Sequence, residues 1–333
     1  MKKSRISIFL IVCMVLAAAL FVGCLGGQQA EERGDGEHFT IGVINLMEHS
    51  ALEAAFDGFV AALAENGYVD GENITIMYDN AQGDQRNLSV IADALVSRDV
   101  DLILSITTPA TQMIAGRTTT IPVLGTAVTS YIVAGVIDSN EAPGGNISGT
   151  SDMNPVAAQI DFIVELVPEV QTIGLIYNSS EANSVLQIGI AKERIREIGL
   201  QYREVTVINT AEVMQAMQSI VGHVEAIYIP TDNTMAAAMP TVHSVAKEAG
   251  IPTICGTSTM VRDGGLAAMG IDYFELGWLT GLMAIEVLHG ANPGDMPIQF
   301  AASSDQIEIN GLVAQEIGFE VPERFLQYVF FPE

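Results

Sequence analysis

The chain contains an internal repeat. Three apolar segments of its first half recur in its second half in the same order, at offsets of 132, 124 and 130 residues. The pairs are TIGVIN at 40–45 and TIGLIY at 172–177, VDLILSITTPATQMIA at 100–115 and VEAIYIPTDNTMAAAM at 224–239, and IPVLGTAVTS at 121–130 and IPTICGTSTM at 251–260. One match of apolar runs can arise by chance, but three in order at a nearly constant offset indicate two domains of one topology.

Strand-like and helix-like segments alternate within each half. Short runs rich in Ile and Val are separated by amphipathic stretches such as residues 51–65, whose apolar residues fall close to helical spacing. This alternation predicts parallel sheets built of βαβ units, with helices on both faces. At 333 residues and 49% hydrophobic, the chain is long enough for two cores. We therefore expect an α/β fold of two similar, doubly wound, Rossmann-like lobes.

Polar residues collect where the predicted strands end, and ligands of open parallel sheets bind beyond those carboxyl ends. The ends read NLMEHS (45–50), TTPAT (107–111) and TAVTSY (126–131) in the first half, and NSSEANS (178–184), TDNT (231–234) and GTST (256–259) in the second. Hydroxyls, amides and N–H groups at helix starts bind a carboxylate or another small anion without transferring protons. Such residues, Asp232 and Ser179 among them, are also ordinary helix N-caps, so recurrence at six strand ends is what indicates a site.

Signatures of catalysis and of metal binding are missing from the sequence. It has no G-x-S-x-G elbow, no G-x-x-x-x-G-K-[ST] phosphate loop and no G-x-G-x-x-G. The five His residues are scattered, with no i, i+4 pair and no Cys beside one, which disfavours a preformed metal site. We expect no catalytic residues, no cofactor and no metal.

The first 24 residues have the pattern of an export signal. A basic stretch with Lys2, Lys3 and Arg5 precedes an uncharged apolar run, and Gly23 comes before Cys24. LFVGC is similar to a lipobox, in which cleavage exposes a Cys that is then acylated, although Phe21 stands where the usual pattern has Leu. The alternative is an uncleaved signal anchor, because a 17-residue run is near the shortest that spans a bilayer. Residues 25–38, Gly-rich and charged, predict a flexible tether.

Charge and cysteine count restrict the partners. The formal net charge of −26 becomes about −29 once the signal is removed, and it repels phosphate backbones, so we expect no nucleic-acid partner. Cys13 lies in the signal and Cys24 would carry lipid, which leaves Cys255 alone in the mature domain. We therefore expect no disulfide framework there.

Four further motifs carry a family resemblance. EHSALEAAFDGF, YNSSEANS, IPTDNT and GIDYFELG, in this order and after a lipobox, resemble the substrate-binding proteins of ABC importers, in the family whose better-known members bind tryptophan and other aromatic amino acids. The resemblance implies the type I periplasmic-binding fold, in which two α/β lobes joined by three crossovers close on a ligand. Crossovers near 149–152, 271–273 and 301–305 give a first lobe of 39–148 plus 273–300 and a second lobe of 149–272 plus 301–333.

The resemblance also implies positions for the ligand site. Carried over by position or by their place at a strand end, the expected ligand-binding residues are Glu48, His49, Ala51, Thr107, Thr108, Pro109, Ala110, Thr129, Ser130, Tyr131, Asn178, Ser179, Glu181, Ser184, Thr231, Asp232, Asn233, Thr257 and Asp272. For an amino-acid ligand, we hypothesise that hydroxyls and helix-start N–H groups hold the carboxylate. Asp232 or Glu181 would then face the ammonium group.

The sequence also departs from the family pattern. Members commonly carry Asp-Pro where this chain has Ser130 and Tyr131, Pro where it has Ser50, and an acidic residue in the loop that here reads CGTSTMV. Two expected carboxylates are therefore neutral, which leaves an anionic or neutral solute as an alternative to an amino acid. Tyr131 could offer an aromatic face to an apolar ligand group.

The resemblance implies a role in uptake. The chain would capture a small molecule by lobe closure and deliver it to an ABC permease and its ATPase subunit, which are separate chains, while the lipid on Cys24 holds it at the extracytoplasmic face of the cell membrane. We expect a monomer. A lipid-anchored sensory domain is the main alternative. A transcriptional regulator would need a DNA-binding head where this chain has an export signal, and an enzyme would need a nucleophile with an oriented base.

Overall fold

The computed structural model describes residues 38–301 and 306–332. The predicted signal, Cys24, nearly all of the tether and most of the third crossover at 301–305 lie outside these residues. Within them, no helix has the length and hydropathy needed to cross a membrane.

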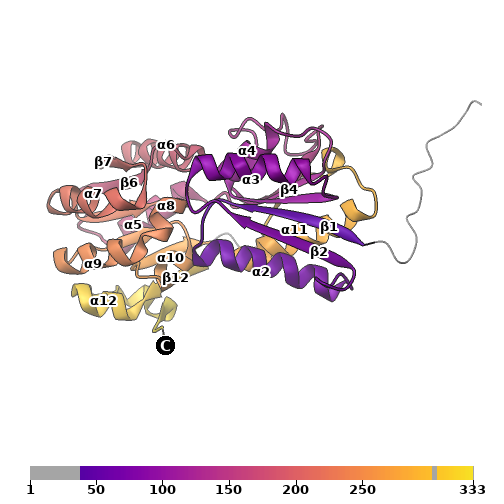
Figure 1. Cartoon of the computed structure of the whole chain (residues 1–333). Coiled ribbons are helices and arrows are strands. Elements are labelled where there is room, and N and C mark those ends of the chain that lie inside the picture. Colours follow the sequence, from indigo (N-terminus) through magenta and orange to yellow (C-terminus); the bar gives the residue numbers. More distant parts are fainter. Residues whose placement is uncertain (1–37, 302–305, 333) are drawn as a thin grey trace, which may run out of the picture. The chain divides into compact units, whose positions relative to one another are not determined.

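The first lobe is built around a six-stranded sheet in the order β11-β5-β4-β3-β1-β2, in which every neighbouring pair is parallel. Figure 1 shows α2 below the strands of this sheet, α11 close to it, and α3 and α4 above the strands. The strands are β1 (Phe39–Asn45), β2 (Ile74–Asn80), β3 (Leu102–Ile106), β4 (Val123–Val128), β5 (Ile147–Ser151) and β11 (Gln299–Phe300). The helices are α2 (Ser50–Glu65), α3 (Gln85–Ser97), α4 (Thr108–Ala115) and α11 (Tyr273–Leu288), with η4 (Pro293–Asp295).

The second lobe has a seven-stranded sheet in the order β13-β12-β10-β9-β8-β6-β7, parallel except between β10 and β12. Its strands are β6 (Thr172–Asn178), β7 (Gln201–Val207), β8 (Ala226–Ile229), β9 (Thr253–Cys255), β10 (Ala267–Gly270), β12 (Gln306–Asn310) and β13 (Val329–Phe330). Its helices are α5 (Val156–Leu166), α6 (Ala182–Glu197), α7 (Val213–Ile220), α8 (Asn233–Ala237), α9 (Met239–Ala249), α10 (Ser258–Arg262) and α12 (Gly311–Ile317), with η2 (Thr210–Glu212), η3 (Val221–His223) and η5 (Glu323–Tyr328).

The internal repeat corresponds to one topology used twice. TIGVIN lies in β1 and TIGLIY in β6, and the order β2-β1-β3-β4 of the first sheet matches β7-β6-β8-β9 of the second. Both β3 and β8 are buried along their whole length, as strands covered on two faces must be. The predicted α/β fold of two similar parallel-sheet lobes is thereby confirmed, while the residue boundaries assigned to the lobes stay a prediction.

Helices α2 and α11 pack with their backbones in direct contact. A Cβ placed on Gly277 would lie 1.7 Å from the carbonyl oxygen of Ala55, and one on Gly58 would lie 2.1 Å from that of Phe274. A Cβ on Gly281 would lie 2.6 Å from the Cβ atom of Ala62. Since real Cβ atoms do not approach so closely, these three glycines are what permits the two helices to lie together. Both helices begin at the carboxyl edge of the first sheet, so their packing fixes the positions of their first turns at that edge.

We predict that Gly277→Ala lowers the free energy of unfolding by about 1–3 kcal/mol, because the added methyl group forces the two helices apart. Urea unfolding of the purified protein measures this change.

The matched control is Gly189→Ala, also within a helix, where a Cβ would meet nothing within 4 Å. Removing a mid-helix glycine there should raise the free energy of unfolding by roughly 0.5–1 kcal/mol. Equal effects of the two substitutions would contradict the close packing of α2 and α11.

Candidate functional site

A pocket lies between the carboxyl ends of the two sheets. The lobes stand close together around it, and the space between its lining residues, with the solvent at its mouth included, amounts to about 300 Å³. The first lobe and its crossovers contribute His49, Ala51, Leu52, Ala127, Asp152 and Tyr273, and the second lobe contributes Asn183, Thr231, Asp232, Asn233, Ala236, Thr257 and Met260. The position agrees with the rule that ligands of parallel sheets bind beyond the ends of the strands.

Glu181 organises the second-lobe wall although it does not line the pocket. Its side chain is 2% exposed and accepts six hydrogen bonds. The donors are the Asn178 and Asn183 side-chain amides, both the backbone and the side chain of Asn233, and both the backbone and the hydroxyl of Thr234. With three donors on each oxygen, this carboxylate is fully engaged inside the protein, contrary to the hypothesis that it could face a ligand ammonium group.

Asp232 both caps α8 and lines the pocket. Its Oδ1 accepts from the backbone N–H of Met235 at 2.8 Å, and its Oδ2 accepts from that of Asn178 at 2.6 Å. Burial and the neighbouring Glu181 carboxylate raise the pKa of Asp232 to about 7. Asp232 therefore has both of the roles expected for it: it is the N-cap of α8, and it lies on the pocket wall.

Asp152 is a second buried carboxylate in the pocket, and it joins two crossovers. Its Oδ1 accepts from the hydroxyl of Thr129 at 2.7 Å and its Oδ2 from that of Tyr273 at 2.6 Å. Burial raises the pKa of Asp152, and the two hydroxyl donors partly offset this effect. Both of its partners are neutral hydroxyls, so its charge is not balanced by them.

Two hydrogen bonds connect the lobes beside the pocket. Nε2 of His49, in the loop before α2, lies 3.3 Å from Oδ1 of Asn233. The next residue, Ser50, donates its hydroxyl to the carboxylate of Asp263 in the second lobe. Burial lowers the pKa of His49 to about 4, although the Asn233 bond opposes the shift, so its ring is neutral at pH 7.

The structure brings some of the expected site residues into this pocket. They are His49, Ala51, Thr231, Asp232, Asn233 and Thr257. A second set supports the wall from behind it, because Thr129, Asn178, Glu181 and Ser184 are buried and bond to pocket residues or to one another.

Other expected residues lie outside the pocket. Thr107, Thr108 and Ala110 are buried at the start of α4, where Thr107 caps the helix. Glu48 and Ser179 are exposed, Ser130 accepts the backbone N–H of Val133, and Asp272 is an exposed cap of α11. For Asp272 the structure favours the capping role alone.

Tyr131 has a structural role rather than a place in the pocket. Its side chain is 1% exposed, and its hydroxyl donates to the carbonyl oxygens of Gly125 at 2.8 Å and Thr150 at 3.0 Å. A Cβ on Gly125 or on Gly149 would lie 2.5 Å from this hydroxyl, so both positions need glycine. The phenol thus occupies space between β4 and β5, and the expectation that its ring faces a ligand is wrong.

Sequence reasoning missed seven pocket residues. Asp152 and Tyr273 lie at predicted crossovers, and Asn183 lies between two expected site residues of YNSSEANS, so polar character near the strand ends could have indicated all three. The apolar residues Leu52, Ala127, Ala236 and Met260 carry no such signal, because in the sequence they are indistinguishable from core residues.

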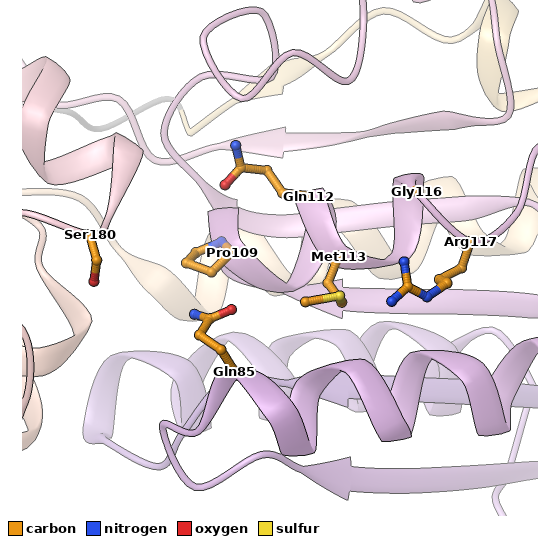
Figure 2. A pocket seen from close by; sticks show the side chains of 7 residues that line it. All are labelled: Gln85, Pro109, Gln112, Met113, Gly116, Arg117 and Ser180. Carbon is orange, nitrogen blue, oxygen red and sulfur yellow. The ribbon is translucent and has the colours of Figure 1, made fainter.

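A second, more open pocket with a cavity volume of about 320 Å³ lies outside this site. Figure 2 shows Pro109, Gln112 and Met113 along α4, Gly116 and Arg117 just after its end, Gln85 at the start of α3, and Ser180 of the second lobe opposite them. Pro109, an expected ligand residue, therefore lines this outer pocket. Among the residues that the structure describes, no group of three His, Cys, Asp or Glu side chains is placed to hold a metal ion.

Comparisons with known proteins agree with this architecture. The family model described as ABC transporter substrate binding protein matches residues 40–330. A relative from Clostridioides difficile (strain R20291), the tyrosine-binding protein, is 38% identical over 315 residues, covering 93% of this chain and 90% of that protein.

Solved structures extend the comparison. An ABC domain from Streptococcus pneumonia in complex with L-Trp is 36% identical with a TM-score of 0.84, and covers 88% of this chain and 100% of that one. The ligand-free, open structure of a substrate-binding protein with adhesive properties from Clostridium difficile is 38% identical, but its TM-score is 0.67, over 89% of this chain and 100% of that one.

Family membership follows from the extent of these matches. The family model covers almost all of the described residues, and the tyrosine-binding relative exceeds one third identity over nearly the whole of both chains. The protein belongs to the ABC transporter substrate-binding proteins and has the type I periplasmic-binding fold.

Proposed function

We propose that this chain captures an aromatic amino acid between its two lobes and delivers it to an ABC permease. The observation that carries the proposal is the charge of the pocket. Asp152 and Asp232 both line it, and within the described parts of the chain no Lys or Arg does so. A ligand with a cationic group gains from two buried carboxylates, whereas an anionic ligand would be repelled by them. This favours an amino acid over the anionic solute that the neutral residue at Ser130 suggested.

The carboxylate end of the ligand has a counterpart in the first turn of α2. His49 precedes this helix without capping it through its side chain, and Ala51 and Leu52 line the pocket. The first N–H groups of a helix have no partner within the helix and carry partial positive charge, so they suit a carboxylate.

The remainder of the ligand would meet an apolar wall. Leu52, Ala127, Ala236 and Met260 line the same pocket. A wall of this kind accommodates an aromatic ring, whose burial contributes most of its binding energy. The two similar proteins named for tyrosine and solved with L-Trp support the aromatic class.

The first prediction concerns ligand class. Residues 25–333 should bind L-tyrosine or L-tryptophan, and ligand at 100 times its Kd should stabilise the fold by about 2.7 kcal/mol. Asp152→Asn should weaken binding by roughly 2–5 kcal/mol, because the ligand ammonium group loses a buried partner. Thermal shift and calorimetry measure both effects.

The control variant is Asp138→Asn, which neutralises an exposed Asp outside the pocket and should leave the affinity unchanged. A small anion that stabilises the protein, while neither aromatic amino acid does so, would contradict the proposed ligand.

The second prediction concerns protons. Asp232, with its pKa raised to about 7, is partly protonated at neutral pH in the empty pocket. A cationic group bound beside it favours the charged carboxylate, so binding should release a proton and the affinity should rise with pH until Asp232 is fully ionised above pH 7. Calorimetry at pH 7 in buffers of different ionisation enthalpy counts that proton.

Asp232→Asn keeps an oxygen to cap α8 but does not titrate, so it should abolish the proton release. Release of equal size in wild type and in this variant would assign the proton to another group.

We place the chain at the extracytoplasmic face of the cell membrane, tethered through a lipid on Cys24 and acting as a monomer. The basic, apolar and small-residue pattern that ends at Cys24 supports export and acylation. Co-purification of a permease from membranes would support delivery, whereas capture of a receptor without a permease would favour the sensory alternative.

Full-length protein expressed in a bacterial host should partition into detergent with the membranes, and Cys24→Ala should prevent acylation of the mature N-terminus. Phase separation followed by mass spectrometry of the N-terminal peptide tests this. Cys255→Ala is the control, since Cys255 is buried in the second lobe. An uncleaved and unacylated wild-type N-terminus would establish the signal-anchor alternative instead.

A further inference from the structure

Two polar atoms of the pocket wall are buried without partners. Nδ1 of His49 and Oδ1 of Asn183 have no hydrogen-bond partner among residues 38–301 and 306–332. Asn183 as a residue is 5% exposed, and both residues line the pocket. Leaving such atoms unpaired is costly, so they indicate a ligand that supplies the missing bonds.

Glu181 sets which way the neighbouring amides point. The side-chain nitrogen of Asn233 donates to Oε2 of Glu181, and that of Asn183 donates to the same oxygen at 3.3 Å and to the carbonyl of Thr231 at 2.9 Å. Because a carboxylate only accepts, both amides must turn their nitrogens toward Glu181. Their oxygens consequently point elsewhere, Asn233 Oδ1 toward His49 and Asn183 Oδ1 without a partner.

The amide oxygen of Asn233 in turn determines the tautomer of His49. An amide oxygen only accepts hydrogen bonds, so Nε2 of His49, 3.3 Å away, must carry the hydrogen. In a neutral imidazole the other nitrogen is then an acceptor with a bare lone pair. Burial, which lowers the pKa of His49 to about 4, keeps the ring in this neutral form. Nδ1 is therefore an acceptor at the pocket wall.

We propose that His49 is a specificity-determining residue whose Nδ1 accepts a hydrogen bond from the ligand's amino group, and that Glu181 is a positioning residue which acts on it through Asn233. Since His49 belongs to the first lobe and Asn233 to the second, the acceptor is oriented only when the lobes are closed. The inference rests on the proposed function, and it identifies His49 as the residue that recognises the amino group of the ligand. Together with Asn183 Oδ1, Asp152 and Asp232, the wall offers acceptors to a group with several N–H donors.

Binding of paired ligands tests the selectivity. Each pair is an amino acid and its desamino acid, beginning with L-tyrosine and 3-(4-hydroxyphenyl)propionate, measured by calorimetry. His49→Leu, which removes the acceptor, should weaken binding of L-tyrosine by about 10- to 100-fold and that of the desamino acid much less. His49→Gln retains an acceptor oxygen and should restore part of the preference. His243→Leu, in α9 outside the pocket, is the matched control and should keep it all.

The nitrogen signals of the His49 ring test the tautomer without any variant. In the ligand-bound wild type, ¹⁵N NMR should show hydrogen on Nε2 and none on Nδ1, and Asn233→Ala should weaken that preference. Hydrogen on Nδ1, or His49→Leu binding both members of a pair with wild-type selectivity, would overturn the inference.

The outcomes also separate this inference from the proposed function. If no aromatic amino acid binds but another amine does, with selectivity that depends on His49, the proposed ligand class fails and the inference stands. If L-tyrosine or L-tryptophan binds and His49→Leu weakens both members of the pair equally, the function stands and the inference fails. Failure of every amine in the panel, or preference of wild type for the desamino acids, overturns both.

Discussion

Six hydrogen bonds hold the buried Glu181 carboxylate, and the loops of the second lobe depend on them. The donors come from the end of β6, the first turn of α6 and the first turn of α8, so one side chain joins the turn between β6 and α6 to a helix start about 52 residues further along the chain. A carboxylate removed from water costs several kcal/mol, which only a complete set of donors offsets. The requirement for donors orients Asn183 and Asn233, and those two amides then shape the pocket wall.

The first lobe contributes charge to the pocket in a different way. At positions 130 and 131 the chain has no carboxylate, and the Tyr131 phenol instead fills the space between β4 and β5 that Gly125 and Gly149 leave open. The negative charge on this side comes from Asp152, one residue beyond the end of β5. The neutral loop thus changes which residue carries the charge, while the pocket remains suited to a cationic group.

The fold was predictable because it depends on repeated local patterns. Apolar runs and amphipathic stretches alternate twice in the same order, and parallel sheets result from that alternation. The direction of individual side chains was not predictable. Asp152 and Asp272 both lie at crossovers, yet Asp152 is buried against Tyr273, whereas Asp272 faces solvent and caps α11. Contacts between segments distant in sequence decide which Asp side chain is buried, and the periodicity of apolar residues does not predict those contacts. Leu52 and Met260 were missed because an apolar residue near the start of a helix has the same sequence pattern whether it packs in the core or lines a pocket.

The glycine contacts between α2 and α11 have a mechanical consequence. Close backbone packing at Gly58, Gly277 and Gly281 leaves no layer of long side chains between the two helices, so a shift of one against the other would meet backbone atoms directly. One of them starts beside His49 and the other starts at Tyr273, whose hydroxyl bonds to Asp152. A ligand that contacts the first turn of α2 is therefore linked, through the packed helix pair, to the crossover at Asp152.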